Sequence, residues 1–278
     1  MAGGKVVVTG ASTGIGEAAA LRLAELGFDV YAGVRNDRDA ERLRGAGLKP
    51  LKIDVTDPDT IAAAVTEISS VGGAGVAGLV NNAGIAVSGP VEFVPLENWR
   101  RQLEVNLIGQ IAVIQQFLPL LRTGRGRIVN VSSIGGRIAL PLAGPYAASK
   151  FGLEAISDSL RREVRGQGIE VSLIEPGGVK TPIWEKGLAE ADSLEAAMPP
   201  EADRLYGQLV NGMRREVDRI VTDTGIDPSE VAEKIVHALT ARRPRTRYLV
   251  GREAKTRWAA AKRLPDRAFD SLIARALR

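Results

Sequence analysis

Short runs of apolar, β-branched residues alternate along the chain with longer segments whose apolar residues recur at helical spacing. Seven such runs predict strands buried on both faces, because they are nearly continuous in apolar residues. They cover residues 5–9, 29–34, 51–53, 78–81, 127–131, 170–175 and 247–250. Segments of helical length lie between them, and this alternation implies right-handed crossovers. We therefore predict an α/β, doubly wound domain with a mostly parallel seven-stranded sheet.

One segment between the sixth and seventh strand runs departs from this alternation of strands and helices. Residues 182–219 are acidic, carry a Pro-Pro pair at 199–200 and contain no strand pattern. In open parallel sheets, ligands bind beyond the carboxyl ends of the strands, and segments that emerge there tend to act as lids. We predict a helical lid insertion over residues 182–219, above a substrate.

No internal repeat or low-complexity linker divides the chain, so we predict a single domain over residues 1–278. Within it, residues 1–180 form the cofactor and catalytic core, and 242–278 form basic C-terminal helices. The 278 residues are 45% apolar with a net charge of +4, which is typical of a globular protein with a large core.

The sequence pattern predicts neither a membrane span nor a signal peptide. No apolar run reaches the ~18 residues of a membrane span, and the strand-like start leaves no room for a signal peptide. We expect a cytoplasmic location.

Charge is concentrated at the C-terminus, where residues 242–278 hold 12 Lys or Arg against 3 Asp or Glu. Few aromatic residues lie among these basic residues, and the chain has no recognised nucleic-acid-binding motif. Both observations argue against a nucleic-acid partner. Solvated helices explain this charge, and contact with an anionic membrane surface is the alternative. In that case the membrane would be contacted by one apolar helix face, formed by Phe269, Leu272, Ile273 and Leu277.

The chain has no cysteine and one histidine, His237. This composition excludes disulfides, thiolate catalysis and cysteine-ligated metals. The carboxylates form no clustered set, so we predict no metal site. His237 lies in a helical pattern, and we assign it no catalytic role.

A glycine-rich loop, TGASTGIG, joins the first strand to the first helix over residues 9–16. Gly10 allows the sharp turn, Gly14 lets the backbone approach a pyrophosphate, and Gly16 permits close packing of helix on strand. The spacing G-x-x-x-G-x-G differs from the more common G-x-G-x-x-G, but the strand–loop–helix context indicates a dinucleotide site.

The end of the second predicted strand bears on the choice of dinucleotide. An acidic residue there binds the ribose 2′-hydroxyl of NAD, whereas an arginine accommodates the 2′-phosphate of NADP. This chain has Val34 followed by Arg35, whose planar guanidinium matches phosphate oxygens. We predict NADP rather than NAD.

The stretch PYAASK places Tyr146 four residues before Lys150, and residues at this spacing share one face of a helix. An ammonium beside a phenol stabilises the phenolate and lowers the pKa of the tyrosine from about 10 towards neutrality. Tyrosine can then exchange protons where histidine is missing. A tyrosine four residues before a lysine is common, so this prediction depends on the other motifs of the chain.

Six motifs follow one another along the chain: TGASTGIG, NNAG at 81–84, Asn106, the Ser132–Ser133 pair, YAASK and PGGVKT at 176–181. In this order and spacing, the chain to about residue 180 resembles the short-chain dehydrogenase/reductase family, whose members have a Rossmann fold. The later segment RYLVG and the basic tail are similar to its steroid- and retinol-dehydrogenase-like branch.

The resemblance implies catalytic roles for four residues. Ser133, with Ser132 as the alternative, would hydrogen-bond the substrate carbonyl oxygen. Tyr146 would exchange a proton with that oxygen. Lys150 would hold the nicotinamide ribose, and Asn106 would anchor a water that connects Lys150 to solvent.

The resemblance also implies cofactor contacts for positions on each side of the sheet edge. Asp54 and Val55 would receive the adenine, and Asn81 would brace the sheet. The other implied contacts are Gly10, Ser12, Thr13, Gly14, Ile15, Gly16, Arg35, Asn82, Ala83, Gly84, Tyr146, Lys150, Pro176, Gly177, Val179 and Thr181.

An apolar pocket is expected between the sheet and the lid, suited to a steroid, retinoid, quinone or aliphatic carbonyl. Its candidate lining residues are Ile85, Val87, Ile134, Ile138, Leu140, Trp184, Leu188 and Met213. The implied activity is NADP-dependent interconversion of a carbonyl and an alcohol, in either direction. The alternative is a dinucleotide sensor with little turnover. By analogy with the family, the apolar helix at 99–121 pairs across the interface of a homodimer or homotetramer.

Overall fold

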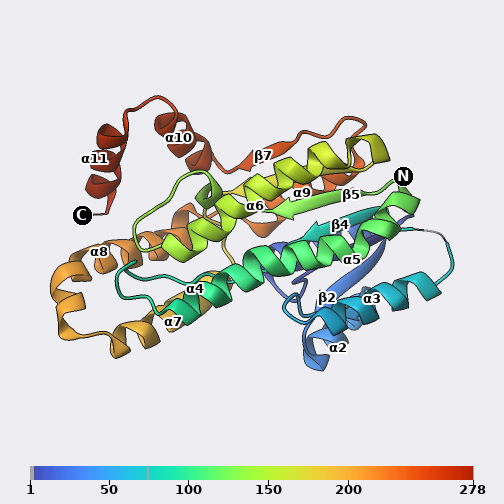
Figure 1. Ribbon diagram of the computed structural model, residues 1–278, viewed down its shortest axis with the longest axis horizontal. Coiled ribbons are helices and arrows are strands. Elements are labelled where there is room, and N and C mark those ends of the chain that lie inside the picture. Colours follow the sequence, from blue (N-terminus) through green and yellow to red (C-terminus); the bar gives the residue numbers. More distant parts are fainter. Residues whose placement is uncertain (1–2, 74, 278) are drawn as a thin grey trace.

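The computed structural model describes residues 3–73 and 75–277, so residues 1, 2, 74 and 278 of the predicted domain lie outside the described residues. Within these ranges, seven strands form one parallel sheet in the order β3-β2-β1-β4-β5-β6-β7 (Figure 1). The strands are β1 Lys5–Val8, β2 Asp29–Val34, β3 Lys49–Lys52, β4 Gly78–Asn81, β5 Arg127–Val131, β6 Glu170–Pro176 and β7 Arg247–Val250. The predicted α/β class and parallel sheet are therefore confirmed.

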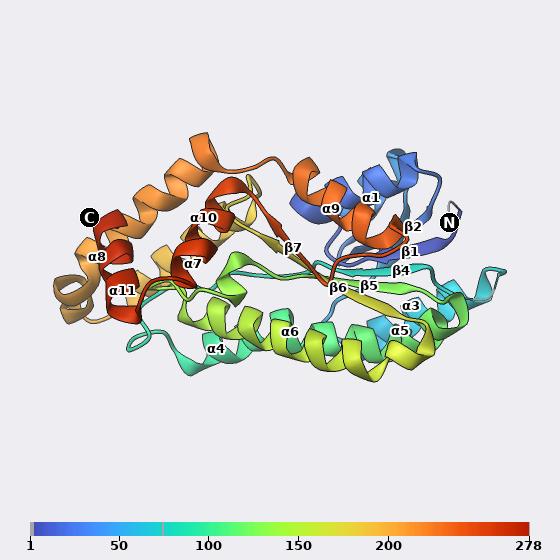
Figure 2. The same ribbon diagram turned by 90° about the horizontal axis from the view of Figure 1, so that it is seen from above.

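Helices cover both faces of the sheet (Figure 2). One face carries α1 (Gly14–Glu25), α2 (Asp37–Gly45) and α9 (Pro228–Thr240). The other carries three more helices, which are α3 (Pro58–Ser70), α5 (Gly109–Gly124) and α6 (Gly144–Glu163). The direction in which the sheet grows reverses between β1 and β4, which is where open parallel sheets form a ligand crevice.

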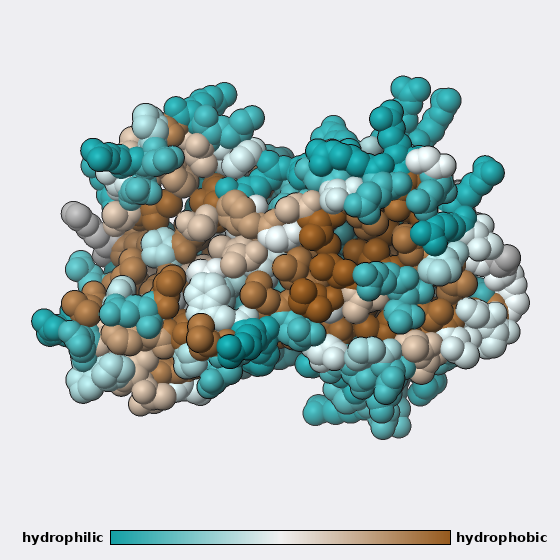
Figure 3. Space-filling model, in the orientation of Figure 1, coloured by the Kyte–Doolittle hydropathy of each residue, from teal (hydrophilic) through white to brown (hydrophobic). Residues whose placement is uncertain are grey.

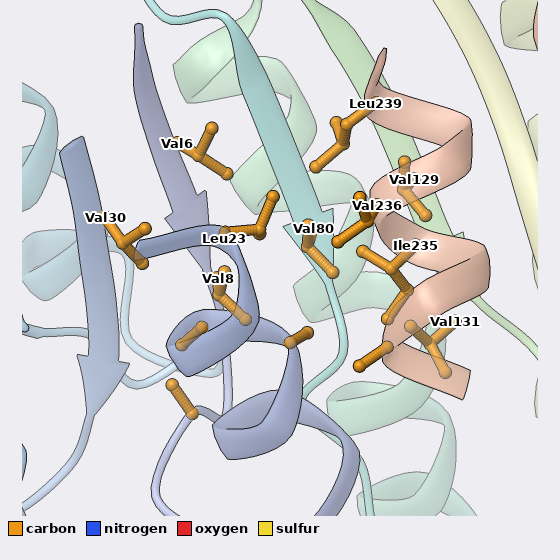
Figure 4. Close-up of a cluster of buried hydrophobic side chains, with 14 of the residues drawn as sticks. Val6, Val8, Leu23, Val30, Val80, Val129, Val131, Ile235, Val236 and Leu239 are labelled. Carbon is orange, nitrogen blue, oxygen red and sulfur yellow. The ribbon is translucent and has the colours of Figure 1, made fainter. Parts of the chain in front are cut away.

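The central strands are rich in apolar residues because both of their faces are buried. Val6 and Val8 of β1 pack against α1 and α9, whereas Val7 between them packs against α3 and α5. Figure 4 shows the first cluster, in which Leu23 of α1 and Ile235 of α9 meet the strand valines. Each such buried side chain contributes about 1.5–3 kcal/mol of transfer free energy.

Predicted and observed boundaries differ most at β3. The apolar run predicted residues 51–53, whereas the strand covers Lys49–Lys52. β3 is an edge strand, so Lys49 and Lys52 reach solvent and Pro50 is tolerated. α3 is capped by Asp57, whose carboxylate accepts from the backbone N–H groups of Asp59 and Thr60.

Among the described residues, one helical segment, Leu96–Gly124, is long and apolar enough to cross a membrane by length and composition, although the sequence predicted no such run. It joins α4 (Leu96–Leu103), a π-helical turn η1 (Glu104–Ile108) and α5. Part of its apolar character belongs to the core of the fold, because Phe117 and Leu121 are fully buried under the sheet.

The segment predicted as a lid consists of α7 (Ile183–Ala197) and α8 (Pro200–Arg219), followed by the π-helical turn η4 (Ile220–Thr224). The C-terminal helices α10 (Arg252–Ala261) and α11 (Asp266–Ala276) lie beside α8 in both ribbon views. They are tethered to the lid rather than freely solvated.

Two contacts make that tether. Arg257 of α10 forms an ion pair with Glu216 of α8, and Arg215 donates to the Leu277 carbonyl. In the apolar face considered for membrane contact, Leu277 is buried, Phe269 and Ile273 are half-buried, and Leu272 is exposed.

Candidate active site

The glycine-rich loop approaches other backbone segments too closely for any side chain. Gly10 and Gly14 have φ of 62° and 61°, and a Cβ on Gly10 would lie 2.8 Å from the Cα of Ala83. A Cβ on Gly16 would overlap the carbonyl oxygen of Gly10. The side-chain amide of Asn82 donates to the carbonyls of Thr9 and Gly10, at 3.1 and 3.0 Å. The loop is therefore held open at the N-terminus of α1, where helix amides favour a phosphate.

One cavity of about 660 Å³ runs along the carboxyl ends of the strands, from this loop to the lid. It brings together every predicted catalytic and cofactor residue except Gly16, which lies behind the loop. The lining set is Gly10, Ser12, Thr13, Gly14, Ile15, Arg35, Asp54, Val55, Asn82, Ala83, Gly84, Asn106, Ser133, Tyr146, Lys150, Pro176, Gly177, Val179 and Thr181.

Arg35 lies at the far corner of the cavity, with its side chain exposed. Asn36 caps α2 by accepting from the Asp39 N–H, and its amide donates to the Asp39 carboxylate at 2.9 Å. Arg42 reaches back to the carbonyl of Ser12. Within residues 3–73 and 75–277, the Arg35 guanidinium has no ion-pair partner, and the nearby Asp39 carboxylate already accepts from Asn36.

Asp54 follows β3, and its carboxylate accepts from the backbone and hydroxyl of Thr56 at 3.0 and 2.7 Å. This turn fixes Asp54 at the cavity wall beside Val55. Asp54 therefore shapes the approach to α3 and also lines the cavity.

Tyr146 and Lys150 project from the first turns of α6, which begins at Gly144. Ser133 caps the short 3-10 turn η2 (Ile134–Gly136), and its Oγ accepts from the Gly135 N–H at 3.0 Å. Burial raises the pKa of Tyr146, and a hydrogen bond with Ser133 opposes that rise. Ser132 is buried, and its Oγ has no hydrogen-bond partner in the described part of the chain, so the geometry favours Ser133 as the serine facing Tyr146.

Lys150 is also buried. Its Nζ donates to the Val131 carbonyl at 2.8 Å and lies 5.8 Å from the centroid of the Tyr146 ring. Burial lowers the pKa of Lys150 to about 8, and the charge of Glu154 opposes this fall.

The direction of the Tyr146 shift is opposite to the one expected from the sequence. The pKa of Tyr146 rises because desolvation of the phenolate outweighs the Ser133 hydrogen bond. Lys150 meanwhile bonds to a backbone carbonyl. The protein alone therefore keeps Tyr146 as a neutral acid.

Asn106 lies in the π-helical turn η1 and is fully buried. Its side chain accepts from the Ile85 N–H and donates to the Ile85 carbonyl, both at 2.9 Å. Asn106 therefore holds the loop after β4 against the site. Irregular π-helical turns of this kind often accompany functional sites.

Seven of the eight candidate substrate-pocket residues line the cavity: Ile85, Ile134, Ile138, Leu140, Trp184, Leu188 and Met213. Val87 was wrongly included. It is fully buried, and its N–H donates to the Gln102 side chain at 2.7 Å. Trp184 joins the lid to the cofactor segment, because its Nε1 donates to the Val179 carbonyl at 2.7 Å.

The lid end of the cavity is more charged than the sequence suggested. Glu195, Arg214 and Glu216 of the lid line it, together with Glu253 and Arg257 of α10. Sequence reasoning missed the contribution of α10, because no local pattern shows that a helix 70 residues after the lid begins will return to it. The charge clustering in 242–278 was the one available signal.

Residues without a predicted catalytic role have structural contacts. His237 Nδ1 lies 2.9 Å from the Tyr248 hydroxyl, outside the cavity. Asn81 braces β4 against β5 by donating to the Asn130 side chain at 3.0 Å.

No group of three or more metal-ligating side chains occurs in residues 3–73 and 75–277.

Comparison with known proteins agrees with this geometry. A family model described as short chain dehydrogenase matches residues 4–192. Retinol dehydrogenase 5 of Mus musculus is 39% identical over 277 residues, 96% of this chain and 87% of that protein. NADPH-dependent 3-dehydrocapnine reductase of Ornithobacterium rhinotracheale is 37% identical over 276 residues, 96% of this chain and 95% of that protein.

A similar solved structure is a short chain dehydrogenase from Burkholderia cenocepacia J2315 in complex with NADP. It has a TM-score of 0.74 at 26% identity, and the match covers 100% of this chain and 98% of that chain.

Proposed function

Because the chain belongs to the short chain dehydrogenase family of oxidoreductases, on its retinol- and steroid-dehydrogenase-like branch, we propose that it interconverts a carbonyl and an alcohol on a largely apolar substrate, with NADP as the hydride carrier. The observation that carries this proposal is the single cavity. It joins the glycine-rich loop at one end to Ser133, Tyr146 and Lys150 in its middle and to the apolar lid residues at the other.

The residues present fit a dinucleotide. Gly10 and Gly14 let the loop pass close to Ala83 and Thr181, where a Cβ would clash, and the amides at the start of α1 suit a pyrophosphate. Arg35 would hold a 2′-phosphate, and the segment from Pro176 to Thr181 would hold the nicotinamide end. A bound nicotinamide supplies or accepts the hydride.

The chain's own residues manage the proton. In reduction, the Tyr146 hydroxyl gives its proton to the carbonyl oxygen as that oxygen gains charge, and the Ser133 hydroxyl hydrogen-bonds the same oxygen. The charge left on the Tyr146 oxygen is stabilised by the Lys150 ammonium on the same helix face. In oxidation, the Tyr146 oxygen takes the proton back from the alcohol.

NADP is proposed over NAD on two grounds. Arg35 is exposed at the corner of the cavity, and the neighbouring Asp39 carboxylate already accepts from Asn36. The reductase of Ornithobacterium rhinotracheale is also described as NADPH-dependent.

The lid end supports an elongated, mainly apolar substrate. Ile138, Leu140, Leu188 and Met213 line it, and its outer wall carries ion pairs. Among the steroid, retinoid, quinone and aliphatic carbonyls expected from the sequence, the similarity to retinol dehydrogenase 5 favours the retinoids. The segment from Ile183 to Arg219 would act as the lid.

The protein would work as a homodimer or homotetramer. Apolar side chains gather over α5 and α6 in Figure 3, and Ile108 and Phe151 are exposed large apolar residues of this region. Analytical ultracentrifugation of the wild-type protein tests this assembly, and a monomer at micromolar concentration would contradict it.

The test of the activity is the oxidation of reduced cofactor, followed by absorbance with all-trans-retinal, a steroid ketone, an orthoquinone and medium-chain aldehydes. We expect turnover of at least one carbonyl, faster with NADPH than with NADH. Arg35→Ala should raise the KM for NADPH about tenfold, as loss of a charged phosphate contact of about 1.4 kcal/mol predicts, and leave that for NADH unchanged. Binding of NADPH without turnover of any member would contradict the proposed reaction.

A further inference from the structure

A group of buried charges lies behind the catalytic lysine and has no place in the proton transfer described above. Arg247 of β7 donates through Nε to Glu154 of α6 at 3.1 Å and lies 3.2 Å from the Glu175 carboxylate of β6. Arg137, which follows η2, forms an ion pair of 2.8 Å with Glu175. Asp158 of α6 pairs with the outer side of Arg247 at 3.0 Å.

The burial of these groups is costly. Glu175 is 1% exposed and Glu154 8%. In residues 3–73 and 75–277, seven buried side-chain polar atoms have no aligned hydrogen-bond partner, and four of them lie here: Ser132 Oγ, Arg137 Nε, Glu154 Oε1 and Glu175 Oε1. Buried polar atoms of this kind destabilise a fold, so their concentration at one place calls for a functional explanation.

Glu154 is the member of the group nearest the catalytic residues. It follows Lys150 by four residues on α6, so the two side chains share a helix face. A Cβ on Gly136 would lie 2.9 Å from Ser132 Oγ, 3.0 Å from Glu154 Cγ and 3.0 Å from the Lys150 carbonyl. The Glu154 side chain therefore lies directly under the turn that presents Ser133.

Charged groups of both signs lie around Lys150. Glu154 carries a carboxylate, Arg137 and Arg247 are cationic, and the Glu175 carboxyl pairs with both arginines. The other titratable groups on the same helix are Tyr146, Asp158, Arg161, Arg162 and Glu163. Burial lowers the pKa of Lys150 to about 8, and Glu154 is the charge that opposes the fall. The Glu154 carboxylate thus favours the charged form of Lys150 in a site where burial disfavours it.

We propose that Glu154, held by Arg247, is a positioning residue that keeps the Lys150 ammonium charged and in place beside Tyr146 at neutral pH. This role rests on the proposed function in one respect, which is that Lys150 stabilises the charge on Tyr146 during the reaction. Glu175 is less suited to it, because its carboxylate is shared between Arg137 and Arg247. Asp158 lies one further turn along α6, beyond Arg247.

The test measures the protonation of Lys150 directly, without turnover. In full-length protein labelled with ¹³C and ¹⁵N at lysine, the Lys150 side-chain signal is the one absent from the Lys150→Arg variant. Its chemical shift is followed from pH 6 to 11. In Glu154→Gln, we expect the titration midpoint to fall by about one pH unit, the size expected for loss of a neighbouring charge in a partly desolvated site.

Two variants separate this role from a general structural one. Asp158→Asn removes a different partner of the same arginine, and its midpoint should stay within about 0.3 units of wild type, because the charge is a further turn away. Arg247→Gln leaves Glu154 without its guanidinium, and the midpoint should rise. If Glu154→Gln does not fold, this opposite shift still tests the proposal.

A midpoint unchanged in Glu154→Gln, or one that falls equally in Asp158→Asn, would overturn the proposal. In an active enzyme, the same variant should show an alkaline loss of kcat/KM at a pH about one unit lower than wild type. A shifted Lys150 midpoint in a protein that turns over no carbonyl would support the positioning role and count only against the proposed reaction.

Discussion

The two halves of the cavity are built from different kinds of contact. The cofactor half is formed by strand ends and by loops joined through main-chain groups, as where Asn82 donates to the carbonyls of Thr9 and Gly10. The substrate half is formed by helices joined through charged side chains. Arg101 of α4 pairs with Glu190 of α7, and Arg257 of α10 pairs with Glu216 of α8.

This difference separates a rigid half from an adjustable one. Main-chain contacts in a buried loop leave little freedom, so the cofactor half is preorganised. Ion pairs that reach solvent contribute only about 0–1 kcal/mol each, so the substrate half can open at low cost. Substrate range is accordingly set in the lid, and the chemistry is set in the sheet.

The largest effect is expected in the rigid half. Gly16→Ala would force a Cβ onto the Gly10 carbonyl, and overpacking of this kind costs about 2–3 kcal/mol. We expect that loss in urea unfolding and a cofactor Kd raised about tenfold or more, because the loop that receives the phosphates must move. Gly45→Ala is the matched control, since its Cβ would meet open space and its φ is not positive. Equal behaviour of the two variants would contradict a preorganised loop.

A smaller effect concerns the buried charge beneath the cofactor half. Burial raises the pKa of Glu175 to about 7, with Glu154 adding to the rise and Arg137 and Arg247 opposing it. Because the folded state then binds a proton more tightly than the unfolded state, the stability contributed by Glu175 is present below about pH 4.5 and is lost as the pH rises to about 7. Relative to Glu175→Gln, wild type should lose on the order of 2 kcal/mol between pH 5 and pH 8.

Urea unfolding at the two pH values measures this difference. A stability difference that does not change with pH would show that Glu175 is ionised throughout and that its arginine partners outweigh its burial.

The smallest effect is expected in the adjustable half. Arg257→Ala removes the link between α10 and the lid, where Glu216 keeps its second partner, Arg219, at 3.1 Å. Loss of about 1 kcal/mol would raise the substrate KM about fivefold and leave the cofactor Kd unchanged. Arg204→Ala is the control, because Arg204 pairs only with Glu201 among the ion pairs of the described residues, on the exposed side of α8. A changed cofactor Kd in Arg257→Ala would mean that the two halves are coupled.

The fold was largely readable from the sequence because the sheet is buried on both faces. Runs such as 5–9 and 127–131 are mostly apolar for that reason, and their strands appear within one residue of prediction. β3 was displaced by two residues because it is an edge strand, where Lys49 and Lys52 reach water and the apolar signal fades.

Within the site, local patterns predicted what local geometry produces. The loop glycines and the Tyr146–Lys150 pair follow from spacing along one loop and one helix. Glu154 could not be predicted, because a glutamate in a helix is normally exposed and its burial depends on Arg247 from a distant strand. Val87 was misplaced for the converse reason, since an apolar residue near a site looks the same whether it lines the cavity or fills the core.

The central claim is that Tyr146 transfers the proton in carbonyl reduction within a cavity that binds cofactor independently. The most direct measurement is kcat for Tyr146→Phe with NADPH and the best carbonyl of the panel, together with the NADPH Kd from fluorescence titration. We predict that kcat falls by about 10²–10⁴, the usual contribution of a general acid, while the Kd stays within about twofold. A variant that retains kcat would contradict the claim.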